Sequence, residues 1–293
     1  MEDLQKLRKF QLWRKSYYRL AIRIGKLIIF YSFFYMVLAA FWAGYMWIVY
    51  TNRFNNTKPY FQLEDSLIGT TPGTSVKPIL GKARRLVIDT NSPDDKVDQM
   101  INTLKPYFVS LNPANNPHVE NCTDDAYASQ EDNFCYFDIS SLPTECTAEQ
   151  QFGFARGRPC IMLRLNRIFA WKPEPYDSTD LKSSNLPSVV RENYSSRNNG
   201  SQLIYLTCEG QSKEDVEWLG PKIAYYPNQG VEFRYFPFLK QAAYLAPFVF
   251  VHFERPKENV NINVHCRWWA RNIAHETDIA HDGLQFRLRI NRE

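Results

Sequence analysis

Residues 27–50 read LIIFYSFFYMVLAAFWAGYMWIVY, a run of 24 residues without a charged side chain that lies between Lys26 and Arg53. As an α-helix this run would be about 36 Å long, which is enough to cross a hydrocarbon core of roughly 30 Å. A cleaved signal peptide has a shorter apolar core and a small-residue cleavage site. This run instead ends in aromatic residues, Trp47 and Tyr50. It therefore predicts one uncleaved membrane-spanning helix.

The charges around this run predict its orientation. The 293-residue chain has 35 basic and 31 acidic residues, but eight of the basic residues and only two of the acidic ones lie in residues 1–26. A basic flank of this kind stays in the cytoplasm. We therefore expect a type II membrane protein with a cytoplasmic tail (1–26), a transmembrane helix (27–50) and an extracellular C-terminus. The near-neutral remainder excludes a uniformly basic nucleic-acid-binding protein, and 44% hydrophobic residues exclude wholesale disorder.

The membrane segment is unusually aromatic, since ten of its 24 residues are Phe, Tyr or Trp. Spacings of three and four place most of these rings on one broad helix face. A four-spaced row of mainly small residues lies beside it and would let another helix approach closely. We interpret both as partner-binding positions, namely Tyr31, Phe34, Tyr35, Leu38, Ala40 and Gly44. The alternative is an aromatic-rich anchor that contacts only lipid.

Beyond the anchor we expect a stalk over residues 51–85 and one ectodomain over residues 86–293. All of the chain's cysteines lie in the ectodomain, at Cys122, Cys135, Cys146, Cys160, Cys208 and Cys266. An even number on the oxidising side of a membrane predicts three disulfides. Fifteen pairings are possible, and the residues alone do not choose among them. A zinc site is disfavoured, because no C-x-x-C pair is present.

Four N-x-S/T sequons follow the anchor and agree with an extracellular location. Asn193 and Asn199 lie in a Ser/Asn-rich stretch that we expect to be a polar loop, so they are the best glycan acceptors. Asn55 is close to the bilayer and Asn121 adjoins a cysteine, so both are weaker candidates.

Period-two patterns dominate the ectodomain and predict half-buried antiparallel strands. They cover residues 161–166, 260–268 and 284–290, and a further strand-like run covers residues 203–207 and ends at Cys208. A helix is expected to begin at Ser92, which precedes Pro and two aspartates and then apolar residues at helical spacing up to residue 108. We therefore expect a mainly-β, disulfide-bonded sandwich with at least one helix, in which a Cys208–Cys266 bridge would fit.

A search for catalytic patterns finds little. The chain has no G-x-S-x-G elbow, no Walker loop, no H-E-x-x-H and no D-x-D. His275 and His281 are six residues apart, a spacing that does not place two metal ligands on one helix face. We therefore expect no catalytic residue, no cofactor and no metal.

Several longer motifs are present along the chain. Residues 30–39 of the anchor read FYSFFYMVLA, residues 152–173 read FGFARGRPCIMLRLNRIFAWKP, and residues 230–237 read GVEFRYFP and are followed by Tyr244-Leu-x-Pro247. In order, they are similar to an FY-x-x-FY-x-x-LA pattern, to a YGY-x-x-G-x-PC block that continues through LNR to KP, and to G-x-x-x-x-YYP and YLQP elements. These patterns belong to one family, and the chain therefore resembles the β-subunits of the Na,K-ATPase and H,K-ATPase. The similarity extends from the anchor to the C-terminal strand.

The resemblance implies a type II glycoprotein with an immunoglobulin-like ectodomain and cysteines paired in order. The implied bridges are Cys122–Cys135, Cys146–Cys160 and Cys208–Cys266. It also implies a non-catalytic partner of a P-type ATPase α-subunit, which assists the folding, plasma-membrane delivery and cation-transport kinetics of that subunit. Tyr31, Phe34, Tyr35 and Gly44 match anchor positions of the family that pack on the α-subunit.

We therefore expect a heterodimeric pump subunit of the Na,K-ATPase or H,K-ATPase type. It would have no nucleic-acid partner and no small-molecule substrate of its own. One alternative is a β-like membrane glycoprotein that acts in adhesion or another protein interaction without a pump. The other is a type II lumenal enzyme such as a glycosyltransferase, which would need a nucleotide-sugar pocket.

Overall fold

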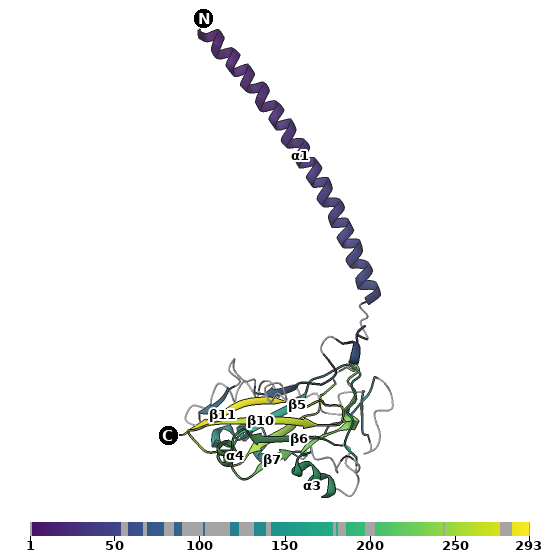
Figure 1. Cartoon of the computed structure of the whole chain (residues 1–293), viewed down its shortest axis with the longest axis vertical. Helices are drawn as coiled ribbons and strands as arrows, with labels where there is room; N and C mark the ends of the chain where they lie inside the picture. The colour runs from purple at the N-terminus through teal and green to yellow at the C-terminus, as the bar shows by residue number, and fades with distance from the viewer. Residues whose placement is uncertain are drawn as a thin grey trace. The chain divides into compact units, whose positions relative to one another are not determined.

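The computed structural model describes residues 2–53, 58–66, 69–78, 85–89, 102, 118–122, 132–138, 142–177, 180, 186–196, 203–242, 244–275 and 283–292. The chain divides into two compact units, residues 1–60 and 61–293. The elements of each unit keep the labels of Figure 1.

The first unit is built on α1 (Glu2–Arg53), one uninterrupted helix of 52 residues (Figure 1). Within the described residues, one stretch of helix, Tyr17–Arg53, is long and apolar enough to cross a membrane. The expected membrane segment lies inside it, so the chain has the N-terminal apolar helix that the sequence predicts. The helix also extends without a break through the basic flank, because that flank contains no proline.

The second unit is mainly β and contains two larger sheets. The four-stranded sheet has the order β1-β5-β9-β7 and is antiparallel throughout. Its strands are β1 (Thr74–Lys77), β5 (Cys160–Leu165), β9 (Val249–Phe253) and β7 (Ile223–Tyr226). Strand β1 falls within the expected stalk, so that this part of the stalk pairs with β5 in the sheet.

The five-stranded sheet has the order β2-β11-β10-β6-β8 and is antiparallel except for the parallel pair β2–β11. Figure 1 shows β6, β10 and β11 side by side in this sheet. Its strands are β2 (Arg85–Asp89), β11 (Leu284–Asn291), β10 (Asn261–Trp269), β6 (Leu203–Gly210) and β8 (Gly230–Glu232). Two short strands, β3 (Val119–Glu120) and β4 (Phe134–Cys135), form a separate parallel pair.

The four strands predicted from the sequence are confirmed as β5, β6, β10 and β11. Strand β11 has the expected alternation of buried and partly exposed residues. Strand β5 is not half-buried as expected, since Met162, which alternates with Ile161 and Leu163, is also only 1% exposed. β5 lies between β1 and β9, and all but one of its residues are buried.

Short helices complete the described ectodomain. The α-helices are α3 (Ser188–Ser196) and α4 (Lys213–Leu219), and the 3₁₀ helices are η1 (Leu63–Asp65), η3 (Thr144–Cys146), η4 (Gln151–Arg156) and η6 (Phe233–Tyr235). Helix α4 begins with a capping box, in which Ser212 and Asp215 bond to each other's backbone N–H groups. The helix expected from Ser92 lies outside the described residues.

Both larger sheets contribute side chains to one buried apolar cluster. Leu163 of β5 and Phe250 of β9 belong to it together with Val264 of β10 and Leu288 of β11, and all four are completely buried. Burial of each such side chain contributes about 1.5–3 kcal/mol. The cluster therefore holds the two sheets together as one domain.

Candidate partner-binding site

The aromatic positions of the anchor are all exposed along α1. Tyr31 stacks on Tyr35, with ring centroids 6.2 Å apart, and Phe34 meets Tyr35 edge-on at 5.5 Å. Leu38 lies on the same face and is 40% exposed. Rings that already contact one another along the helix lose little side-chain freedom when another surface covers them. The arrangement gives a broad apolar surface suited to a second helix.

The small residues form a separate face of α1. At about 100° of rotation per residue, Ala40 and Gly44 lie roughly 120–160° around the helix from the centre of the aromatic face. A Cβ atom placed on Gly44 would meet no atom within 4 Å, so the space above this glycine is open. One straight helix cannot cover both faces at once. The anchor therefore presents two separate exposed faces, an aromatic one and one with small residues.

The three disulfides join the same pairs that the family resemblance implies. They are Cys122–Cys135, Cys146–Cys160 and Cys208–Cys266. The last bridge differs from the inter-sheet disulfide of antibody domains, because Cys208 and Cys266 are directly opposite each other on neighbouring strands of one sheet. Their Cα atoms are 4.1 Å apart. This bridge therefore fastens β6 to β10 and leaves the two sheets joined by packing.

The sequons occupy different environments. Asn121 is exposed beside Cys122, as an acceptor of glycan must be. Asn193 lies in α3, so the expectation of a loop at this position is wrong. Asn55 and Asn199 lie outside the described residues.

Within the described residues, the histidine and cysteine groups do not make a metal site. Cys146, Cys160 and His252 bring their ligand atoms within 4.8 Å of one another, but the two sulfur atoms are bonded together. His252 is 6% exposed, and its burial lowers the pKa of the imidazole. A neutral imidazole packed on a disulfide has no thiolate partner with which to bind zinc.

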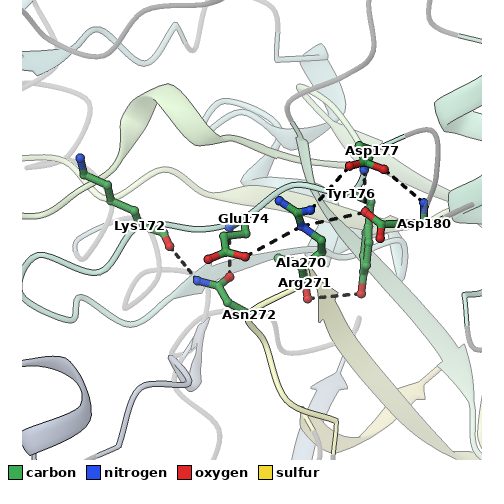
Figure 2. A network of polar contacts seen from close by, with 8 residues as sticks. All are labelled: Lys172, Glu174, Tyr176, Asp177, Asp180, Ala270, Arg271 and Asn272. Carbon is green, nitrogen blue, oxygen red and sulfur yellow. Dashed lines mark hydrogen bonds and ion pairs between the residues drawn. The ribbon is translucent and has the colours of Figure 1, made fainter.

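A polar network that the sequence patterns did not reveal joins two segments about 90–100 residues apart (Figure 2). Arg271 follows β10, and its guanidinium lies 3.9 Å from Glu174, 3.6 Å from Asp177 and 3.9 Å from Asp180. These side chains are partly exposed, so each ion pair contributes little stability on its own. One arginine nevertheless contacts three carboxylates, so the cluster connects the segment after β10 to residues 174–180.

Uncharged groups strengthen the same connection. The side-chain amide of Asn272 donates to the carbonyl of Lys172 (2.8 Å) and accepts from the backbone N–H of Glu174 (3.0 Å). The hydroxyl of Tyr176 donates to the carbonyl of Ala270 at 3.2 Å (Figure 2). Burial raises the pKa of Tyr176, so the hydroxyl keeps its proton at neutral pH. No local sequence pattern reveals bonds of this kind.

Comparison with known proteins accounts for both parts of the chain. The family model described as the sodium/potassium ATPase beta chain matches residues 13–286. Sodium/potassium-transporting ATPase subunit beta-2 of Drosophila melanogaster is 32% identical over 91% of this chain and 85% of its own length. Subunit beta-1 of the same organism is 31% identical over 87% and 81%, and human subunit beta-2 is 28% identical over 91% and 86%. With matches that cover the anchor and the ectodomain alike, the chain belongs to the sodium/potassium ATPase beta chain family.

Proposed function

We propose that this protein is the non-catalytic β-subunit of a P-type cation-transporting ATPase. The observation that carries the proposal is the family match over residues 13–286, which includes the membrane helix and nearly all of the ectodomain. The subunit would assist the folding, membrane delivery and transport kinetics of an α-subunit of the Na,K-ATPase type. An H,K-ATPase type remains the related possibility within the wider family, and the curated relatives favour the sodium/potassium pump.

We further propose a single-pass type II protein of the plasma membrane. Residues 1–26 would lie in the cytoplasm, residues 27–50 would span the bilayer, and residues 51–85 and 86–293 would form the extracellular stalk and ectodomain. The basic flank supports this orientation, because Arg14, Arg19, Arg23 and Lys26 are exposed on the helix directly before the apolar run. Sequons Asn55, Asn121, Asn193 and Asn199 would then face the compartment in which glycans are added.

The proposed α-subunit contacts are the two faces of α1. The aromatic face would pack on one pump helix or on a lipid-filled groove through Tyr31, Phe34, Tyr35 and Leu38. The row with Ala40 and Gly44 would allow close approach of another surface. Each aromatic pair adds about 0.5–1.5 kcal/mol beyond the area that it buries. Two such pairs would contribute about 1–3 kcal/mol to assembly.

For the ectodomain we propose an immunoglobulin-like sandwich. The two sheets that share one buried cluster support this architecture. The five-stranded sheet differs in one respect from the antiparallel sheets of immunoglobulin domains, because β2 pairs with β11 in parallel. The sandwich would act as a binding module on the extracellular side of the pump.

Co-purification from a membrane extract tests the pump assignment. The full-length chain is expressed in cells that contain a Na,K-ATPase α-subunit, extracted in mild detergent, and analysed for proteins that it retains. We expect stoichiometric recovery of the α-subunit and ouabain-sensitive transport at the cell surface. Recovery of well-folded, surface-delivered protein without an α-subunit would contradict the proposal and favour a β-like adhesion protein.

Anchor variants test the proposed faces. The double variant Tyr31→Ala, Phe34→Ala should lower α-subunit recovery roughly five- to 150-fold, in line with a loss of about 1–3 kcal/mol. Tyr50→Ala is the control, because its ring lies about a quarter turn around the helix from Tyr31 and from Ala40. Gly44→Leu should weaken assembly by filling the open space above Gly44. A loss for Tyr50→Ala equal to that of the double variant would refute the aromatic face.

A further inference from the structure

Two adjoining hollows lie on the ectodomain surface near the start of β5 and the end of β9. Their volumes are about 300 and 670 Å³, and both are lined by Arg156, Arg158, Glu254 and Arg255. The first two arginines flank Gly157 in the turn between η4 and β5, and Arg255 is the second residue after β9. Three arginines from two segments that are almost 100 residues apart therefore meet around one depression.

The turn that carries two of these arginines has a well-defined backbone. Gly153 and Gly157 both adopt positive φ angles of 73° and 67°. A Cβ atom on Gly153 would collide with the carbonyl oxygen of Arg158, whose own N–H donates to the carbonyl of Gly153 at 3.0 Å. The Cys146–Cys160 bridge closes the segment that contains this turn. The backbone under Arg156 and Arg158 is therefore held in place before any ligand arrives.

Within the part of the chain that the structure describes, the positive charges of these three arginines are not balanced by ion pairs. Among the described residues, no carboxylate lies within 4.0 Å of the guanidinium group of Arg158 or Arg255. The guanidinium of Arg156 donates to the side-chain amide of Gln150, which is uncharged. Guanidinium groups that converge without acidic partners attract an anion.

The carboxylates of the same depression are mostly neutralised. Glu254 pairs with Lys222 at 3.1 Å, and Glu258 pairs with Arg292 at 2.9 Å. Glu145 is then the one acid of the lining without an ion pair among the described residues. With these pairs set aside, three arginines face one carboxylate, so the hollow keeps a net positive charge.

The remaining lining groups suit a ligand rich in hydroxyls. Gln150 offers an amide, Glu145 a carboxylate acceptor, and Tyr226 an aromatic ring. His252 lies in the lining of the smaller hollow, and its lowered pKa, caused mainly by burial, leaves it uncharged at neutral pH. Such a polar lining differs from the mostly apolar pockets that hold hydrophobic ligands. An anion carried on a polyhydroxylated ring matches it in charge and in hydrogen bonding.

We propose that this hollow binds an acidic saccharide whose carboxylate or sulfate group is held by Arg158 and Arg255. The planar guanidinium fork binds the two oxygen atoms of such an anion in parallel, which a lysine cannot do. The sugar hydroxyls then face Gln150 and Glu145. The anionic group belongs either to a sialic-acid-type sugar or to a sulfated polysaccharide. This binding does not depend on assembly with a pump.

Titration of the full-length protein with defined sugars tests the proposal. The protein is purified in detergent, its own N-linked glycans are removed enzymatically, and binding is followed by saturation-transfer NMR. The probes are 3′-sialyllactose, a heparin-derived sulfated disaccharide, and neutral lactose. We expect at least one acidic probe to bind tenfold or more tightly than lactose, and to weaken as salt rises from 50 to 500 mM. The acidic probe that binds identifies the source of the anion.

Substitutions locate the binding in the hollow. Arg158→Gln and Arg255→Gln should each weaken the acidic probe at least tenfold, and Arg255→Lys should restore only part of the loss. Arg267→Gln is the matched control, because Arg267 lies in β10 and pairs with Glu209 outside this hollow. Unchanged melting curves and disulfides separate loss of binding from loss of folding. Equal binding of lactose, or equal effects of Arg267→Gln and Arg158→Gln, overturns the proposal.

Discussion

The carboxylate of Asp215 connects α4 to β10 and is a sensitive point for testing the energetics of the ectodomain. Asp215 is 3% exposed. Its Oδ1 accepts from the backbone N–H of Asn263 at 2.9 Å, and its Oδ2 accepts from the hydroxyl and the backbone N–H of Ser212 at 2.9 and 3.2 Å. The side-chain amide of Asn263 donates to Oδ2 at 3.3 Å. Asp215→Ala would remove all of these acceptors at once.

The expected loss follows from these bonds. A hydrogen bond to a charged group contributes about 1.5–3 kcal/mol, and a buried donor left without a partner costs about 1–3 kcal/mol. The bonds share one carboxylate and are not additive, so we expect Asp215→Ala to lower the free energy of unfolding by about 3 kcal/mol. For a domain of this size, 1 kcal/mol shifts the melting temperature by about 2–4 °C. The melting temperature should therefore fall by roughly 6–12 °C.

Thermal unfolding with the disulfides intact provides the assay. Glu214→Ala is the matched control, because Glu214 is the preceding residue in the first turn of α4 and is exposed. Its loss should cost about 0.3–1 kcal/mol through the helix dipole. A difference of less than about 1 kcal/mol between the two variants would refute the reasoning.

The same carboxylate predicts a pH dependence. Burial acts to raise the pKa of Asp215, but hydrogen bonds from Asn263 and Ser212 outweigh it and hold the pKa below the usual 3.8. A lowered pKa in the folded state means that the stabilisation is complete above pH 4 and is lost as the pH falls through the folded pKa. The stability gap between the wild type and Asp215→Asn should therefore narrow below pH 4. A constant gap down to pH 2 would contradict this account.

Three further substitutions test other parts of the ectodomain. Burial raises the pKa of Tyr225 to about 12, and its hydroxyl accepts from the backbone N–H of Cys208 at 2.9 Å. Tyr225→Phe should cost about 1–2 kcal/mol in denaturant unfolding and leave the ultraviolet tyrosinate titration below pH 11 unchanged. Gly153→Ala should reduce the cell-surface yield several-fold, because its Cβ would collide with the Arg158 carbonyl; a normal yield would refute this. Arg271→Gln should lower stability by about 1 kcal/mol in low salt and by less in high salt, as melting curves at both can show.

The alternation of β11 could be predicted from the sequence, whereas strand β9, which is buried on both faces, could not. β11 alternates between buried and partly exposed residues, so its period of two is visible in residues 284–290. β9 reads VFVHF and all five of its residues are buried, so both of its faces are covered. A short apolar run of this kind has no periodicity that separates a strand from a buried helix. The capping box at Ser212 precedes a helix of only seven residues, too short for a clear apolar stripe.

The candidate sites show the same division between local and long-range information. The anchor face over Tyr31–Leu38 is set by helical spacing alone, so the sequence predicts it directly. The hollow lined by Arg158 and Arg255 depends on the pairing of β5 with β9, in which Cys160 lies opposite His252. Arg158 takes a variable position of the motif in residues 152–173 and Arg255 lies in none of the quoted motifs, so nothing in the linear order indicates that they meet. Contacts of this kind require the fold.

Because α1 continues for 52 residues without a break, the side chains of the anchor and of the segment before it keep fixed angles around one helix axis. About 20 residues suffice to cross the hydrocarbon, so the N-terminal part projects as a rigid rod of roughly 35 Å. A molecule that binds this N-terminal part is then held at a fixed angle around the helix axis relative to the proposed docking faces of the anchor. Inserting one residue near Gly25 would turn the outer end by about 100°, whereas inserting seven would restore its direction to within about 20°. A rotation of the N-terminal end about the helix axis would therefore turn the exposed faces of the anchor by the same angle.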